Sequence, residues 1–225
     1  METNSIMLSP VEQEERAFAL AQRQAKVYTS STIVPTAYQG DKNIGNAIIA
    51  LDIAKRINAN PLMVMQNLYI VHGNPSWSSK FLIATINNCG RFTPLRYEFK
   101  GEEGKTSRAC RCYAYEKGDK EHTEPLYGAW ISMEMAQKEG WTNKSGSKWL
   151  TMPEQMLQYR AAAFWQRVYA PEISMGLLTA DEAEDITPEH PQVQTQEEVV
   201  EVPFEEIEEP ADKVKATMAR QGKEG

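Results

Sequence analysis

Two arginines, Arg160 and Arg167, have the side-chain type and spacing that best suit chemistry in this sequence. They lie in residues 153–169, which we predict as a helix because Thr151 can cap its start and Pro153 is tolerated in the first turn. At about 100° per residue, a separation of seven places both side chains on one edge of the helix. This edge borders a predicted apolar stripe of Leu157, Ala161, Phe164 and Val168. Because a guanidinium stays charged and offers a planar fork of donors, the edge can bind successive phosphates.

Carboxylates are the alternative partners for these arginines. Ion pairs are common on partly exposed helix edges, so each arginine can instead pair with a nearby acid. Residues 141–146 are predicted as a polar loop beside the same helix. Loops with Lys, Ser and Gly can bind phosphate through side chains and backbone N–H groups. An ordinary surface connection remains the alternative for this loop.

A series of short motifs runs from about Ser31 to Ile186. The downstream motifs are Trp149, Pro153, Met156-Leu157, Arg160-Ala161, Arg167, Gly176, Asp181-Glu182-Ala183-Glu184 and Ile186. The upstream motifs are Ile33-Val34-Pro35, Tyr38-Gln39, Ala50-Leu51-Asp52-Ile53-Ala54 and the run from Pro61 to Pro75. Together they resemble the conserved core of phage single-strand annealing proteins of the RecT/Redβ type. One departure is Glu154-Gln155, where Redβ-like sequences often carry basic residues, so phosphate contacts must come from elsewhere or DNA binding is weaker.

The resemblance implies ATP-independent binding of single-stranded DNA and annealing of complementary strands in phage homologous recombination, in the cytoplasm of a bacterial host cell. It implies no catalytic role and no required cofactor, with Mg²⁺ left open. It also implies a homo-oligomeric ring or filament. The residues we expect to bind DNA are Arg160, Arg167, Lys144, Lys148, Arg108 and Arg111. Trp77, Trp149 and Trp165 can stack on bases, although tryptophans in mixed folds more often pack in the core.

Two other classes of function fit parts of the sequence. A metal-dependent nuclease or similar DNA-processing enzyme would use Glu98, Glu134 or the acidic run 181–185, because hard cations bind clustered oxygens. On a helix, however, consecutive acids point in different directions, so a solvated face or a helix start capped at Thr179 explains the run better. A phage adaptor protein would act through the acidic tail, residues 187–225. The sequence contains no Gly-x-x-x-x-Gly-Lys-Ser/Thr loop for ATP and no Gly-x-Ser-x-Gly elbow.

Charge is distributed unevenly along the 225 residues, whose net charge is -7. Residues 187–225 hold ten acidic and four basic residues, which accounts for -6 of that charge. Residues 77–169 hold 14 basic and ten acidic residues, so a local basic groove is permitted. The prolines and glutamates after Ile186 predict a disordered tail with one apolar segment, Val199 to Phe204. The resemblance implies that this segment can recruit a phage exonuclease or a host single-strand-binding protein.

The predicted fold is α+β, a small antiparallel sheet packed with several helices. Strands are expected at 68–71, 92–99, 108–115 and 126–131, and helices at 9–28, 43–57, 61–65, 80–88, 132–138 and 153–169. We expect three parts: an N-terminal helix (1–30) that can serve in oligomerisation, an annealing core (31–186) and the tail (187–225). No apolar run is long enough to cross a membrane. Three cysteines without metal-ligand spacing support neither a disulfide framework nor a zinc site.

Overall fold

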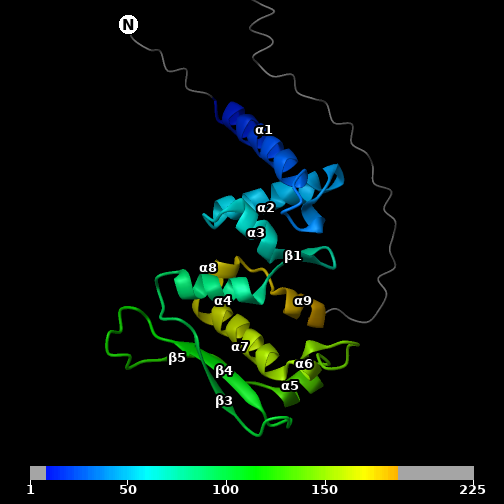
Figure 1. Ribbon diagram of the computed structural model, residues 1–225. Helices are drawn as coiled ribbons and strands as arrows, with labels where there is room; N and C mark the ends of the chain where they lie inside the picture. Colours follow the sequence, from blue (N-terminus) through cyan, green and yellow to red (C-terminus); the bar gives the residue numbers. More distant parts are fainter. Residues whose placement is uncertain (1–8, 187–225) are drawn as a thin grey trace, which may run out of the picture. The chain divides into compact units, whose positions relative to one another are not determined.

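The computed structural model describes residues 9–186 (Figure 1). The described residues form one compact unit by their internal contacts. The predicted disordered tail, 187–225, lies outside the described residues. Within residues 9–186, no helix is long and apolar enough to cross a membrane.

The N-terminal helices and a hairpin share one hydrophobic cluster. Its elements are α1 (Pro10–Thr29), α2 (Ile44–Arg56), α3 (Pro61–Asn67), β1 (Leu68–Val71) and β2 (Asn74–Trp77), with 3-10 turns at Thr36–Tyr38 and Asp41–Asn43. Helix α1 begins with the predicted cap at Ser9, whose hydroxyl accepts from the N–H of Glu12 while the Glu12 carboxylate accepts from the N–H of Ser9. Ala47, Ala50 and Ala54 of α2 are fully buried, so α1 and α3 can approach this helix closely.

A four-stranded antiparallel sheet forms the second part of the fold. Its strands are β3 (Arg96–Lys100), β4 (Ala109–Ala114), β5 (Leu126–Tyr127) and β6 (Ile131–Ser132). Strand β4 is central: β3 pairs along one edge, and β5 and β6 pair with different parts of the other edge. The predicted strand 126–131 is therefore wrong as one continuous strand. Gly128 interrupts it, and an added Cβ there would lie 3.2 Å from the Cys112 oxygen and 3.3 Å from Trp165 Cβ.

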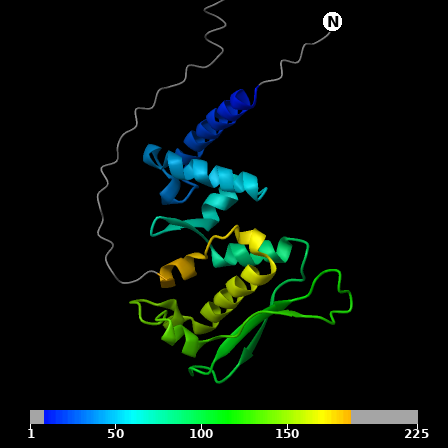
Figure 2. The ribbon, with the colours of Figure 1, turned by 180° about the vertical axis from the view of Figure 1, so that it is seen from behind.

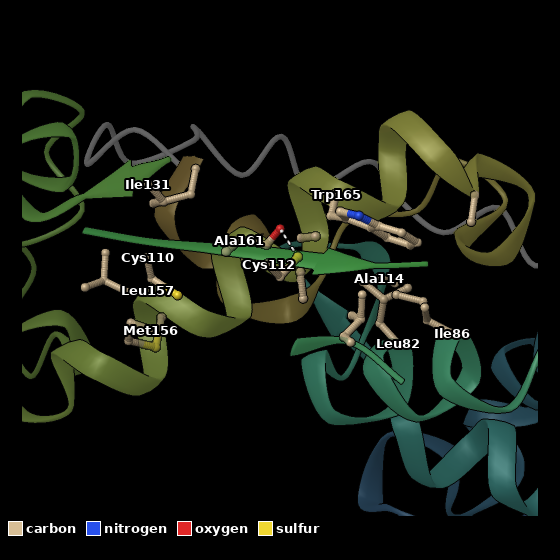
Figure 3. Close-up of a cluster of buried hydrophobic side chains, with 14 of the residues drawn as sticks. Leu82, Ile86, Cys110, Cys112, Ala114, Ile131, Met156, Leu157, Ala161 and Trp165 are labelled. Carbon is tan, nitrogen blue, oxygen red and sulfur yellow. Dashed lines mark hydrogen bonds between the residues drawn. The ribbon is translucent and has the colours of Figure 1, made fainter. Parts of the chain in front are cut away.

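Helix α7 (Pro153–Tyr169) packs against the inner face of this sheet, and α4 (Ser79–Asn88) packs on α7 (Figures 1 and 2). The other helices here are α5 (Met133–Lys138), α6 (Lys148–Thr151), α8 (Pro171–Ser174) and α9 (Ala180–Ile186). Small side chains let α7 and β4 approach closely, and the Cys112 thiol donates to the carbonyl of Ala161 at 3.2 Å (Figure 3). The buried contact surface between α7 and β4 stabilises the fold through the hydrophobic effect and dispersion.

The predicted α+β class is confirmed, as are the bounds of the helix 153–169. Two details of that helix were predicted wrongly. Thr151 does not cap it: Thr151 ends α6, and the N-cap of α7 is Met152, which has no side-chain cap. The single apolar stripe is also wrong, because Val168 is 70% exposed. Buried residues instead occur around most of the helix, since the sheet, α4 and α6 all contact it.

Candidate nucleic-acid interface

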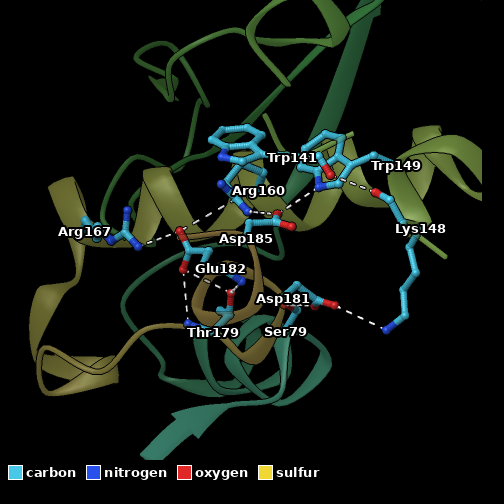
Figure 4. A network of polar contacts seen from close by, with 11 residues as sticks. Ser79, Trp141, Lys148, Trp149, Arg160, Arg167, Thr179, Asp181, Glu182 and Asp185 are labelled. Carbon is cyan, nitrogen blue, oxygen red and sulfur yellow. Dashed lines mark hydrogen bonds and ion pairs between the residues drawn. The ribbon is translucent and has the colours of Figure 1, made fainter. Parts of the chain in front are cut away.

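Arg160 is buried, with only 3% of its side chain exposed. Its Nη2 donates to Asp185 Oδ2 at 2.5 Å, and its Nε lies 3.9 Å from Glu182 Oε1 (Figure 4). The guanidinium lies 3.8 Å from the ring centroid of Trp141 and 5.5 Å from that of Trp149. Burial lowers the pKa of Arg160, and the two carboxylates oppose that shift. A phosphate therefore cannot reach this guanidinium in the described conformation.

Arg167 also binds α9, but it is 41% exposed. Its Nη2 lies 2.5 Å from Oε1 of Glu182. The Glu182 carboxylate is buried and accepts from both the N–H and the hydroxyl of Thr179, at 3.1 and 3.0 Å. In return, the Glu182 N–H donates to the Thr179 hydroxyl at 3.4 Å. The predicted helix start capped at Thr179 is thus confirmed as a capping box that also fixes the partner of Arg167.

Lys148 and Lys144 lie on the other side of α9. Lys148 Nζ is 3.5 Å from Asp181 Oδ1, and Asp181 also accepts from the Ser79 hydroxyl at 2.8 Å. Lys144 and Lys148 line a pocket with acids of α9, including Asp185. The indole N–H of Trp149 donates to Asp185 at 2.8 Å. Four of the six predicted cations therefore gather around α9, within reach of its acids.

This arrangement matches the carboxylate alternative for Arg160 and Arg167. It also weighs against the nuclease hypothesis, because Asp181, Glu182 and Asp185 each bind cations rather than converging on one point. Within residues 9–186, no group of three or more His, Cys, Asp or Glu side chains is placed to hold a metal ion. The other acids considered for a nuclease are paired as well, Glu98 with Arg111 and Glu134 with Lys138.

Arg108 lies beside the start of α7. It forms a fork with both oxygens of Glu154, at 2.7 and 3.1 Å, and its guanidinium lies 4.6 Å from the Phe99 ring centroid. The hydrogen bond to Glu154 raises the pKa of Arg108. Glu154 is the acid that stands where Redβ-like sequences often carry a basic residue, and here it binds a cation from the sheet.

Arg111 lies on the opposite face of the sheet, paired with Glu98 at 2.8 Å. Arg96 and Lys100, which the sequence analysis did not select, are exposed on the same face, because alternate residues of β3 share a side. The spacing Arg96-x-Glu98-x-Lys100 was the signal that could have identified them. By contrast, Trp77, Trp149 and Trp165 are at most 1% exposed, so they pack in the core.

Comparison with known families agrees with these features. The model of the RecT family matches residues 89–197, a segment that begins at the end of α4 and includes the whole β3 to β6 sheet, α5 to α9 and the six predicted cations. No curated protein and no solved structure gives a significant match. The upstream motifs, from Ser31 to Pro75, lie outside the match. Over the matched residues, the resemblance to the RecT family is confirmed.

Proposed function

We propose that this protein binds single-stranded DNA and anneals complementary strands without ATP, as part of phage homologous recombination. The observation that carries the proposal is the RecT match over the segment that holds both the cationic sheet face and the cations around α9. Annealing requires no covalent step from the protein. It requires cations that bind the backbone while the bases stay free to pair.

The six predicted residues take different parts in this proposal. Lys144, Lys148 and Arg167 are partly or largely exposed and are the direct phosphate contacts beside α9. Arg108 and Arg111 supply cations at the sheet. Arg160, which is buried, acts as a positioning residue that holds α9 and the two tryptophans beside the exposed cations. The proposed DNA contacts are therefore Arg167, Lys144, Lys148, Arg108 and Arg111, with Arg160 holding α9 in position.

An annealing assay separates this function from its alternatives. Two labelled complementary strands are mixed with the protein, without ATP, with and without Mg²⁺, and then analysed for pairing and length. Full-length strands that pair faster than without protein support annealing. Strands that shorten with Mg²⁺ would establish the nuclease alternative. If the strands neither pair faster nor shorten, the adaptor function is the remaining alternative.

Salt dependence tests the lysines. Replacing Lys144 and Lys148 together by Ala should reduce the log–log salt slope of single-strand binding by about 0.7 for each lost phosphate contact. The matched control replaces Lys42 and Lys55, exposed lysines outside the matched segment, and should leave the slope unchanged. Equal slopes in both double variants would remove these lysines from the interface.

Self-association is the second part of the proposal, and α1 supports it. Residues 10–20 of α1 are exposed throughout, and an isolated helix of that length is marginal in water. The helix exposes Val11 (63%), Phe18 (55%), Leu20 (50%) and Val27 (70%). Replacing Phe18 and Leu20 by Glu should reduce the mass measured by light scattering, whereas Val168→Glu on α7 should not. An unchanged mass would exclude α1 as the contact.

The proposed partners of the tail, a phage exonuclease and a host single-strand-binding protein, concern residues outside the described part. Affinity capture with the whole chain, and with a chain that ends after Ile186, tests them. Capture that depends on the tail supports these partners, and equal capture by both chains does not.

A further inference from the structure

The outer face of the sheet is formed by residues that alternate with its core residues. In β4, Cys110, Cys112 and Ala114 are buried toward α7, so Arg111 and Tyr113 point to the other side. Paired residues on neighbouring antiparallel strands share a face. By that rule the outer face also holds Arg96, Glu98 and Lys100 of β3 and Tyr127 of β5. No helix among residues 9–186 covers it to the extent that α7 covers the inner face, since Arg96, Lys100 and Tyr127 stay exposed.

Aromatic and cationic groups on this face form a continuous series, which we call the aromatic row. The row consists of His122, Tyr115, Tyr113, Tyr127, Arg111, Trp130 and Lys100. Ring centroids are 4.6 Å apart for His122 and Tyr115, 5.9 Å for Tyr115 and Tyr113, and 5.4 Å for Tyr113 and Tyr127. Each member therefore contacts the next across the sheet.

Cations complete the row at its other end. The Arg111 guanidinium lies 3.6 Å from the Tyr127 ring centroid and 4.7 Å from that of Trp130. Lys100 Nζ lies 4.1 Å from the Trp130 centroid. Among the face residues named above, Arg96, Lys100 and Arg111 outnumber the one carboxylate, Glu98. The face is thus both rich in π surfaces and complementary in charge to a polyanion.

We propose that the aromatic row is a stacking site for the unpaired bases of single-stranded DNA. The inference rests on the proposed function and adds to it the part of the surface that holds bases rather than phosphates. Base faces are available for such stacking only when the strand is unpaired, and every base has one, so the contact is independent of sequence. The ring centroids of the row are 4.6 to 5.9 Å apart, wider than the roughly 3.4 Å rise of stacked bases in a duplex, so the bound strand is extended.

A strand without bases tests this inference. Affinity is measured for an ordinary oligonucleotide and for an abasic strand of the same length and charge, with the unmodified protein and with Tyr127→Leu and Trp130→Leu. The unmodified protein should prefer the ordinary strand by about tenfold per stacked base, and each variant should lose about tenfold of that preference. Tyr69→Leu, an aromatic replacement on the separate β1–β2 hairpin where Tyr69 is 49% exposed, is the matched control and should keep it.

Fluorescence gives a second measurement that needs no stacking variant. The chain has five tryptophans, and four of them, Trp77, Trp141, Trp149 and Trp165, are at most 6% exposed, which leaves Trp130 as the most accessible. The ordinary strand should quench this emission and the abasic strand should not.

The outcomes separate the two proposals. Binding without any preference for bases, or variants that keep the full preference, would overturn the stacking site while the proposed function stands. Loss of self-association in the two variants, with the base preference unchanged, would assign the row to contact with a second copy instead. An unmodified protein that neither binds nor anneals single strands would overturn the proposed function first, and the stacking site with it.

Discussion

Replacing Arg160 by Ala should unfold this protein at a markedly lower temperature, because the change leaves the buried Asp185 carboxylate without its arginine. Asp185 and Glu182 are 8% and 3% exposed, and Arg160 is the cation nearest to Asp185. Removing one partner of a buried ion pair costs about 3–5 kcal/mol. Arg167→Ala breaks a pair whose arginine is 41% exposed, and surface pairs contribute about 1 kcal/mol or less.

These free energies convert into separable melting temperatures. For a domain of this size, 1 kcal/mol shifts the melting temperature by about 2–4 °C, so Arg160→Ala should lower it by roughly 6–20 °C and Arg167→Ala by a few degrees at most. Circular dichroism melts of both variants and the unmodified protein measure the shifts. Single-strand binding across a range of salt concentrations, below the melting temperature of each variant, measures the phosphate contacts.

The two readings of Arg160 give opposite results. As a positioning residue, it changes stability strongly and the salt slope little. If Arg160→Ala melts within about 2 °C of the unmodified protein and its salt slope falls by about 0.7, the side chain reaches phosphate and the buried-pair reasoning is refuted. Arg167→Ala should show the reverse balance, with a small change in stability and a lower slope.

Three further results are expected. Cys110 and Cys112 should resist a thiol-reactive dye at pH 8 until the protein unfolds, since burial raises the pKa of both thiols, that of Cys110 to about 12. The free energy of unfolding should fall as the pH rises above the ordinary thiol pKa of 9.0, because only the unfolded state then releases these protons. Gly101→Ala should lower the melting temperature more than Gly104→Ala: both have positive φ, but only at Gly101 would the added Cβ lie 2.1 Å from a backbone oxygen. Ending the chain after Ile186 should leave the melting temperature nearly unchanged and keep or raise single-strand affinity at low salt, as titration with labelled oligonucleotide would show, because the removed residues carry a net charge of -6.

Sequence patterns were sufficient for α1, α2, α4 and α7 because capping and periodicity act locally, whereas the short helices α6 and α8 were not predicted. Ser9 and Pro10 fixed the start of α1, and the run 153–169 had both a proline start and a helical period. Capping by Thr151 failed for a local reason as well, since α6 ends at that residue and leaves its side chain outside the first turn of α7.

Burial of Arg160 could not be predicted from the same patterns. Seven residues separate Arg160 and Arg167, and helical geometry alone places them on one edge. Whether that edge meets solvent depends on α9, which is brought over Arg160 by tertiary contacts with the β1–β2 hairpin and the bridge between Trp77 and Thr179. Such contacts join segments about 100 residues apart in the chain, and no local spacing records them.

Register in β4 links the core to the proposed stacking site. Cys110, Cys112 and Ala114 are small enough to let α7 lie close to the sheet, and this choice leaves the larger Arg111 and Tyr113 for the outer face. A slip of one residue would exchange the two sets and drive an arginine and a tyrosine into the contact with α7. The cost of that exchange fixes the register. The same packing that stabilises the inner face therefore also determines which side chains of β4 lie in the aromatic row on the outer face.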